Sequence, residues 1–356
     1  MAQEPRLLSL ATAVPHYVLH QEDVQARFGI LFSKHRERFE RLLPVYGNAG
    51  IDTRYSCVPL EWYLEAHGWR ERSELFVAHA TELLARATRD CLERAGLAID
   101  DVDGIVAVST SGVATPSLDA LVMERLGMRR DLRRLPVFGL GCAGGVLGLA
   151  RASEMARVYP GERVLFLVVE LCGLTFRRGD QSKSNVIATA LFGDGAAAAL
   201  ISCTGDGPAL TASGEYTWSA SLDVMGWRVR DDGFGVLFSR DIPALVRADY
   251  RAAIERFLKR QGLGLDDIGE FLCHPGGAKV LVAIEEALEL PQGSLNHSRE
   301  VLRDYGNMSA ATVLFVLDRA LGNGGLARRS LMTSLGPGFT AGFLLVENDL
   351  AAAAAG

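Results

Sequence analysis

The sequence predicts an α/β layered fold built from two similar halves. Apolar residues recur at helical spacing between residues 73 and 96, and a short β-branched run over 104–109 follows as a buried parallel strand. In addition, the segment 93–102 resembles the segment 259–268, which lies 166 residues later in the chain. Helices that alternate with buried strands indicate stacked α and β layers, and the repeat indicates that these layers occur twice.

The other elements follow from the same periodicities. In the first long helix, Ser73 is expected to be the N-cap and Gly96 to end the helix. The charged segment 226–240 is expected to form an inserted loop or hairpin. Further apolar patterns predict strands over 135–139, 163–169 and 196–202 and a helix over 143–158.

The repeat also aligns landmarks further along the chain. At nearly the same offset, Cys142 and Asn307 each open a helix, and the strand at 163–169 matches 329–335. The two residues are therefore expected at related helix N-termini near a pseudo-twofold centre. A stretch rich in Gly, Ser, Thr and Pro at 205–214 marks the boundary between the halves. This boundary divides the chain into an N-terminal half, 1–207, and a C-terminal half, 208–356.

Composition and charge exclude several classes of protein. Of the 356 residues, 49% are hydrophobic and 22% charged, which is the balance of a globular protein rather than a disordered one. The formal net charge of −6 would repel polyanions, so nucleic acid and anionic membranes are not expected as partners. The apolar runs are too short for a spanning helix, and the N-terminus does not resemble a secretory signal. A cytoplasmic protein with no integral membrane segment is therefore expected.

Cys142 is the candidate nucleophile among six cysteines. It lies in the sequence Gly-Leu-Gly-Cys-Ala-Gly-Gly, residues 139–145, whose small side chains let a ligand approach the backbone, and a helix begins directly after it. The partial positive charge of the helix N-terminus would favour the thiolate. The alternative is a small buried apolar residue, which is expected for the cysteines without glycine neighbours. Because no Cys-x-x-Cys pair is present, neither a zinc site nor a dithiol redox motif is indicated.

His274 and Asn307 are candidates to act together with Cys142. His274 ends the apolar run 268–273 and precedes Pro-Gly-Gly, so a strand delivers an imidazole to a tight turn. Asn307 precedes the apolar helix predicted over 310–321. Each residue taken alone has a structural explanation, as a histidine bonded to a backbone carbonyl or as an N-cap. Together the three form a Cys-His-Asn set that spatial rather than sequential adjacency would assemble.

Five motifs carry a resemblance to a known family. They are Gly141-Cys-Ala-Gly-Gly145, Leu191-Phe-Gly-Asp-Gly-Ala196, His274-Pro-Gly-Gly277, Gly306-Asn-Met-Ser309 and Gly336-Pro-Gly338. Because of the order and spacing of these motifs, the chain resembles the type III polyketide synthases, which are the chalcone and stilbene synthase family of the thiolase-like superfamily. It is most similar to the bacterial members that make long-chain alkylpyrones or alkylresorcinols. In the related enzymes that initiate fatty-acid synthesis, the histidine is usually followed by Gln-Ala-Asn instead.

The resemblance implies a fold, a reaction and partners. The fold would be the thiolase-like αβαβα arrangement of two pseudo-duplicated halves. An acyl-CoA starter, a long-chain fatty acyl group in this subgroup, would acylate Cys142. His274 and Asn307 would stabilise the enolate formed when malonyl-CoA loses carbon dioxide, and the extended chain would cyclise to an alkylpyrone or alkylresorcinol. No metal or redox cofactor would be required, and the enzyme would be a homodimer.

The resemblance also implies residues around the substrate. Phe192 matches an aromatic gate between a CoA tunnel and the cavity, and Val236 replaces a second gate phenylalanine, which would admit a larger starter. Arg38, Arg41 and Arg54 lie in the region where the family binds the phosphates of CoA. The further substrate-binding residues would be Thr110, Thr115, Cys172, Thr175, Trp227 and Ser309.

Two other functions are alternatives to this hypothesis. An initiating β-ketoacyl-ACP synthase of fatty-acid synthesis would also use a Cys-His-Asn set, but it would need a basic surface for an acyl carrier protein, which this acidic chain does not plainly offer. A non-catalytic thiolase-fold partner subunit would be expected to lack one of the three residues, and all three are present.

Overall fold

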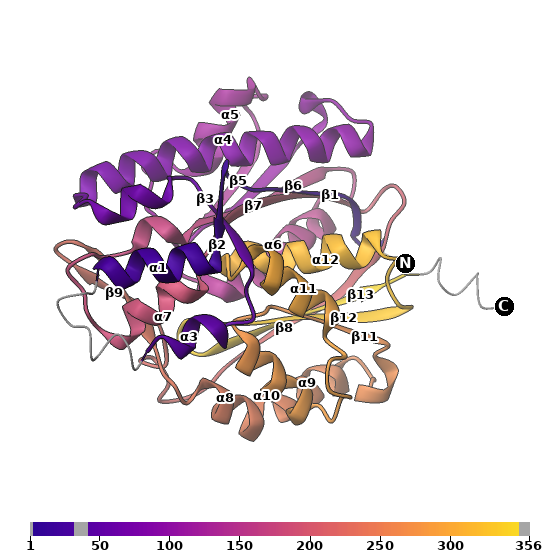
Figure 1. The fold of residues 1–356 in the computed structure, drawn as a ribbon. Helices are drawn as coiled ribbons and strands as arrows, with labels where there is room; N and C mark the ends of the chain where they lie inside the picture. Colours follow the sequence, from indigo (N-terminus) through magenta and orange to yellow (C-terminus); the bar gives the residue numbers. More distant parts are fainter. Residues whose placement is uncertain (1–2, 32–41, 349–356) are drawn as a thin grey trace.

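The computed structural model describes residues 3–31 and 42–348. Its elements stack in five alternating layers of helix and sheet (Figure 1). One outer layer contains α4 (Trp69–Ala95) and α5 (Leu118–Leu126), and the opposite one contains α9 (Arg251–Arg260) and α10 (Ala278–Ala287). The central layer contains α6 (Gly144–Val158) and α12 (Thr312–Gly322). This is the αβαβα arrangement that the resemblance implies.

The strands run in the order β11-β12-β13-β8-β1-β7-β6-β4-β5. The ladder divides into two sheets, which are joined where Arg6 of β1 pairs with Ala209 of β8. The N-terminal sheet consists of β1 (Arg6–Ala13), β4 (Gly104–Val108), β5 (Arg133–Val137), β6 (Arg163–Leu171) and β7 (Asp194–Ser202). The C-terminal sheet consists of β8 (Ala209–Thr217), β11 (Glu270–Cys273), β12 (Arg329–Gly336) and β13 (Thr340–Glu347).

The sequence repeat is confirmed as a structural repeat. Short 3₁₀ helices occupy Ile99–Asp101 and Leu265–Asp267, at the same offset as the sequence match. The strands that follow, β4 and β11, each pair in parallel with the strand that begins later in its own half, β6 or β12. Equivalent segments of the two halves therefore adopt equivalent structures.

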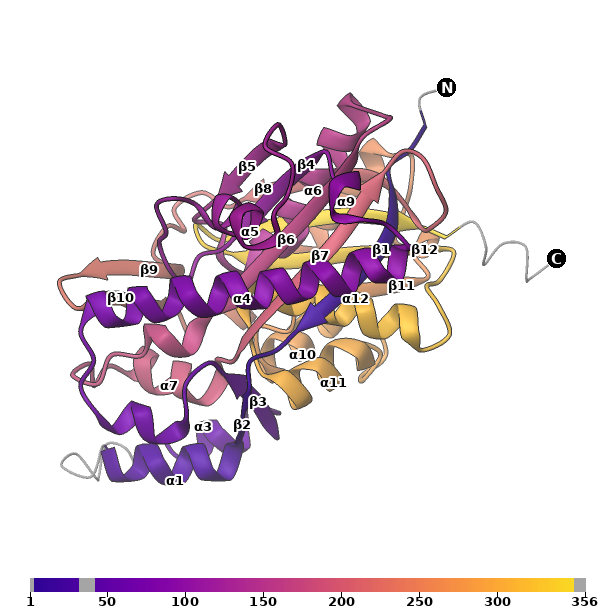
Figure 2. The ribbon, with the colours of Figure 1, turned by 90° about the horizontal axis from the view of Figure 1, so that it is seen from above.

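Three apolar clusters hold the layers together. One lies between α4 and the N-terminal sheet, which α4 crosses in Figure 2. The second surrounds α6 and α12 between the two sheets, and the third packs the C-terminal sheet against α9 and α10. The central helices approach so closely that a Cβ at Gly145 would clash with the carbonyl oxygen of Ala310. Gly145 is thus required by packing between the halves, whereas a Cβ at Gly144 would clash with Val108 of its own half.

Most predicted elements are confirmed, with shifts at their ends. Gly96 ends α4 in the left-handed conformation, with φ +66°. Ser73 is not the N-cap, because α4 begins at Trp69 and the Ser73 hydroxyl donates to the Trp69 carbonyl within the helix, at 2.9 Å. The charged segment forms a hairpin of β9 (Met225–Arg230) and β10 (Gly233–Phe238).

Smaller elements gather beside the N-terminal sheet. β2 (Tyr17–His20) pairs with β3 (Thr53–Ser56), and α1 (Gln21–Leu31) follows β2 directly. Figure 1 shows α1, α3 (Pro44–Gly47) and α7 (Lys183–Leu191) on the same side of the molecule. Further helices are α8 (Ile242–Leu245), a π-helix over Val246–Tyr250 and α11 (Asn296–Tyr305). Within residues 3–31 and 42–348, no helix has both the length and the apolar character to cross a bilayer.

Candidate active site

Cys142 lies where the central layer begins. It is buried within a 3₁₀ turn, Gly141–Ala143, that leads into α6. Gly141 has φ +49°, and a Cβ there would clash with the ring of Pro337, so the turn requires glycine at this position. The Sγ–H of Cys142 donates to the Ser309 hydroxyl at 3.5 Å. The nucleophile candidate from the first half therefore contacts the start of the equivalent helix in the second half.

Asn307 holds the turn that contains Ser309. Its Oδ1 accepts from the Ser309 amide at 2.8 Å, and its Nδ2 donates to the Gly276 carbonyl at 3.2 Å. Ser309 has φ +47°, a conformation rarely adopted by residues other than glycine. Backbone strain of this kind is often found at functional sites. The Asn307 side chain thus links the turn that contacts Cys142 with the Pro-Gly-Gly turn after His274.

His274 ends β11 with its imidazole buried. Its amide donates to the Thr333 carbonyl at 2.8 Å, which extends the pairing of β11 with β12 by one residue. Neither ring nitrogen has a hydrogen-bond partner among the described residues. Because a buried polar group without a partner is costly, this imidazole is the clearest candidate to contact a substrate. The alternative that the ring bonds a backbone carbonyl is wrong.

Burial favours the uncharged forms of both Cys142 and His274. It raises the pKa of the Cys142 thiol to about 12, an effect that the Ser309 hydrogen bond reduces and nearby Glu170 increases. Burial also lowers the pKa of His274 to about 3. At neutral pH the site therefore holds a thiol and a neutral imidazole. Burial therefore opposes the thiolate that the helix N-terminus is expected to favour.

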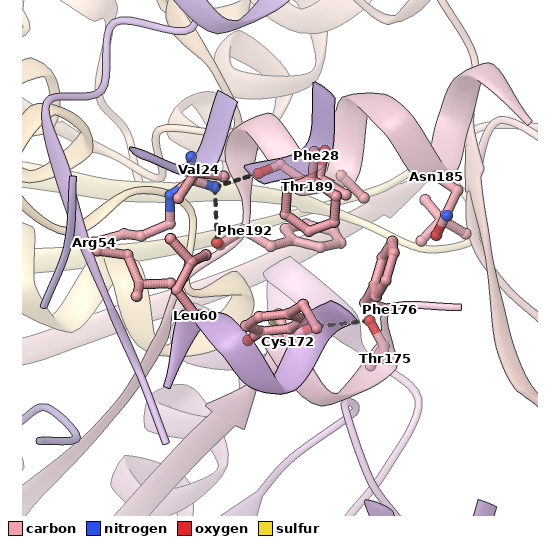
Figure 3. A pocket seen from close by; sticks show the side chains of 15 residues that line it. Val24, Phe28, Arg54, Leu60, Cys172, Thr175, Phe176, Asn185, Thr189 and Phe192 are labelled. Atoms are coloured by element: carbon pink, nitrogen blue, oxygen red, sulfur yellow. Dashed lines mark hydrogen bonds between the residues drawn. The ribbon is translucent and has the colours of Figure 1, made fainter. Parts of the chain in front are cut away.

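An apolar pocket lies beside this site (Figure 3). Phe192 lines it and forms an isolated parallel bridge with Asn307. Cys172 also lines it, and burial together with nearby Glu170, Asp194 and Cys142 raises the pKa of its thiol well above the ordinary value. The other walls are mainly apolar and come from α1, the 3₁₀ helix Leu60–Leu64 and α7. The pocket therefore extends from Cys172 and Phe192 toward α1, and Cys142, His274 and Asn307 are not among its lining residues.

Several of the substrate-binding residues that the resemblance implies lie around this pocket or beside the turn Gly141–Ala143 that contains Cys142. Phe192, Cys172, Thr175 and Val236 line the pocket. Trp227 pairs with Val236 in the hairpin, and its indole ring lies 6.1 Å from that of Phe192. The Trp227 Nε1–H donates to the Thr110 carbonyl at 3.1 Å, and the Thr110 hydroxyl accepts from the Gly141 amide at 3.0 Å.

Two of the implied residues do not fit the roles that the resemblance implies. Thr115 is exposed and does not line the pocket of its own chain. Arg54 is only 2% exposed, and its guanidinium donates to carbonyl groups of α7 and of Phe192. It is therefore not available to a CoA phosphate at the surface, and that assignment is wrong. Arg38 and Arg41 lie outside the described residues.

Glu170 is a buried carboxyl group that motif reasoning assigned no role. It accepts hydrogen bonds from the amides of Thr110 and Ser111, the latter at 2.8 Å, at the end of β6. Burial raises its pKa from 4.5 to about 7, although these hydrogen bonds oppose the shift. The only signal in the sequence was a charged residue at the end of an apolar run. In the part of the chain that the structure describes, no group of three His, Cys, Asp or Glu side chains could hold a metal ion.

Glu170→Gln is expected to change how stability depends on pH. Between about pH 4.5 and 7 the unfolded chain ionises this carboxyl while the folded chain resists ionisation. The wild-type free energy of unfolding therefore falls as pH rises through this window, by about 3 kcal/mol. The glutamine variant lacks this titration. The difference between its free energy of unfolding and that of wild type should therefore be about 3 kcal/mol more favourable to the variant at pH 8 than at pH 4.5, measured by urea unfolding. An equal difference at both pH values, as expected for the exposed control Glu65→Gln, would contradict the assignment.

Comparison with known proteins agrees with this geometry. The family models for the N-terminal and C-terminal domains of chalcone and stilbene synthases match residues 2–206 and 213–348. A Bacillus subtilis protein described as "Putative chalcone synthase" is 38% identical and covers 95% of this chain and 97% of its own length. A 1,3,6,8-tetrahydroxynaphthalene synthase of Streptomyces peucetius subsp. caesius is 37% identical, with coverages of 94% and 91%. The crystal structure of 1,3,6,8-tetrahydroxynaphthalene synthase from Streptomyces coelicolor A3(2), a bacterial type III polyketide synthase, matches with a TM-score of 0.91 at 28% identity, covering 96% and 99% of the two chains.

Proposed function

The chain belongs to the chalcone and stilbene synthase family and is a type III polyketide synthase, and from this premise we propose that it extends a long-chain fatty acyl starter, held on Cys142, with malonyl-CoA. The observation that carries the proposal is the apolar pocket that extends from Cys172 and Phe192 to α1. A pocket of this character stabilises an aliphatic chain by removing its surface from water.

The first step is transfer of the starter to Cys142. The Sγ attacks the thioester carbonyl of the acyl-CoA, a new C–S bond forms, and the C–S bond to CoA breaks. The thiol proton passes through the neutral imidazole of His274 to the leaving CoA sulfur. The two unpartnered ring nitrogens of His274 support this role, because a neutral imidazole can accept a proton at one nitrogen and donate one from the other.

The second step is decarboxylation of malonyl-CoA. The bond to the carboxylate carbon breaks, and its electron pair forms an enolate at the thioester carbonyl. The Nε2–H of His274 and the Nδ2–H of Asn307 donate to the developing oxyanion. The enolate carbon then attacks the acyl group on Cys142. The new carbon–carbon bond forms, the C–S bond to Cys142 breaks, and the departing sulfur takes up a proton from solvent to restore the thiol. Donors fixed in a dry site are effective here because they need no reorganisation as the charge develops.

The aromatic residues around Phe192 separate the reacting centre from the pocket. The Phe192 ring lies 5.7 Å from that of Phe238 and 6.1 Å from that of Trp227. In this proposal the starter chain passes this aromatic group, and after a few extensions the product cyclises to an alkylpyrone or alkylresorcinol. The reaction needs no metal or redox cofactor, because decarboxylation supplies the carbon nucleophile. The enzyme works as a homodimer in the cytoplasm, in keeping with its six free cysteines.

The product profile of the purified enzyme tests this proposal. Malonyl-CoA is supplied with acyl-CoA starters from acetyl to stearoyl, and the products are identified by mass spectrometry. Long-chain pyrones or resorcinols are the expected products. A requirement for malonate bound to a carrier protein would instead favour an initiating β-ketoacyl-ACP synthase.

Ala188→Phe is expected to shorten the longest accepted starter. Ala188 is buried on α7 and lines the pocket, so a phenyl ring there fills space that the chain would occupy. We expect kcat/KM for palmitoyl-CoA to fall by about tenfold or more, with little change for acetyl-CoA. Ile187→Phe is the matched control, since the neighbouring residue on the same helix does not line the pocket. Equal effects on both starters would argue against an acyl chain in this pocket.

A further inference from the structure

Arg54 is a buried cation without a carboxylate partner. The residue comes from β3, and no ion pair among residues 3–31 and 42–348 includes it, although its side chain lines the pocket. Burial lowers its pKa to about 10, so it is still protonated at neutral pH. Buried charges are normally paired, and this one must therefore be stabilised by other groups.

The groups that stabilise it are carbonyls at the C-terminal end of α7. Nη1 of Arg54 donates to the Thr189 carbonyl at 2.6 Å and to the Phe192 carbonyl at 3.2 Å (Figure 3). Its Nη2 donates to the Oε1 of Gln21, the first residue of α1. The Nε2 of Gln21 in turn donates to the Ala190 carbonyl at 3.0 Å. The last carbonyls of a helix lack intrahelical partners and carry partial negative charge, so a guanidinium is well placed there.

The remaining carbonyl of this helix end is bonded by Asn307. The Asn307 amide donates to the Leu191 carbonyl at 2.8 Å, and its own carbonyl accepts from the Gly193 amide at 3.0 Å. One short segment, 189–193, therefore lies between the Arg54–Gln21 pair on one side and the backbone of Asn307 on the other. Any displacement of the segment moves both Phe192 and Asn307.

We propose that Arg54, oriented by Gln21, is a positioning residue that sets the placement of Phe192 and Asn307 at the same time. The roles of Phe192 and Asn307 in this inference rest on the function proposed above. The effect of Arg54 on their positions does not depend on that function. The planar guanidinium reaches two carbonyls and Gln21 at once, which the single ammonium group of lysine cannot reproduce. Arg54 thereby couples selection of the starter to stabilisation of the enolate, although it need not contact either substrate.

Hydrogen exchange in Arg54→Lys tests the placement without relying on activity. Exchange is measured by mass spectrometry on the full-length protein, and the critical amides are those of Gly193 and Asn307. We expect them to exchange about tenfold faster in the variant, while amides of α4 and α6 keep their wild-type rates. Arg329→Lys is the matched control, because that arginine pairs with Glu347 at 2.7 Å at the far end of β12 from His274. Gln21→Leu, which removes one helix-end contact, is the second variant if Arg54→Lys does not fold.

Kinetics on the same variants test the consequence. We expect malonyl-CoA decarboxylation to slow by about tenfold or more, since small displacements of a positioned donor are costly, and the ratio of kcat/KM for palmitoyl-CoA to that for acetyl-CoA to change. Unchanged exchange at Gly193 and Asn307, or uniformly faster exchange throughout the protein, would overturn the positioning role. A wild-type enzyme that makes no polyketide would overturn the proposed function instead, while the exchange data would still decide whether Arg54 positions these two residues.

Discussion

Cys142→Ala is expected to lower polyketide formation by about three orders of magnitude or more, because the starter then has no nucleophile on which to reside. Malonyl-CoA decarboxylation should persist within about tenfold of wild type, since the proposed donors for that step are His274 and Asn307. Product formation is measured by mass spectrometry and decarboxylation by the appearance of acetyl-CoA. In this variant, polyketide formation should therefore be lost while malonyl-CoA decarboxylation continues.

A second buried cysteine provides the control for this experiment. Cys203 donates to the Ala156 carbonyl at 3.4 Å and lies outside the pocket. Cys203→Ala should keep both activities near the wild-type level. If Cys142→Ala retained product formation, or if both cysteine variants lost it equally, Cys142 would not be the acyl carrier.

Asn307→Asp is expected to slow both decarboxylation and condensation by about 10²- to 10³-fold, the effect of losing one oxyanion donor. A carboxylate can still accept from the Ser309 amide, but it cannot donate to the developing oxyanion, and it adds negative charge to a buried site. Acylation of Cys142 by a radiolabelled starter should proceed, because that step does not require the Asn307 donor. This pattern is the reverse of that expected for Cys142→Ala.

The control for this variant is Asn323→Asp, at the exposed C-cap of α12. It makes the same chemical change away from the site and should leave both activities unchanged. Thermal unfolding of each variant separates loss of function from loss of folded protein. Wild-type decarboxylation in folded Asn307→Asp would remove Asn307 from the oxyanion site.

Local sequence patterns predicted much of the fold, because the relevant interactions are local or periodic. Gly96 ends α4 in the left-handed conformation as expected, and the repeat places equivalent 3₁₀ helices at Ile99–Asp101 and Leu265–Asp267. Ser73 failed as an N-cap because a serine inside a helix can bond the carbonyl four residues earlier, and the sequence pattern does not separate the two cases.

The sequence by itself determined the family, the five motifs and the candidate Cys-His-Asn set, since these depend on residue identity and spacing. Only the tertiary structure decided the charge state and the surroundings of those residues. The buried site holds Cys142 as a thiol and His274 as a neutral imidazole, and Arg54 lies inside the protein at the end of α7 rather than at the surface. The physical reason is that burial is produced by segments far apart in the chain, and desolvation outweighs the local preferences that a sequence pattern can reveal.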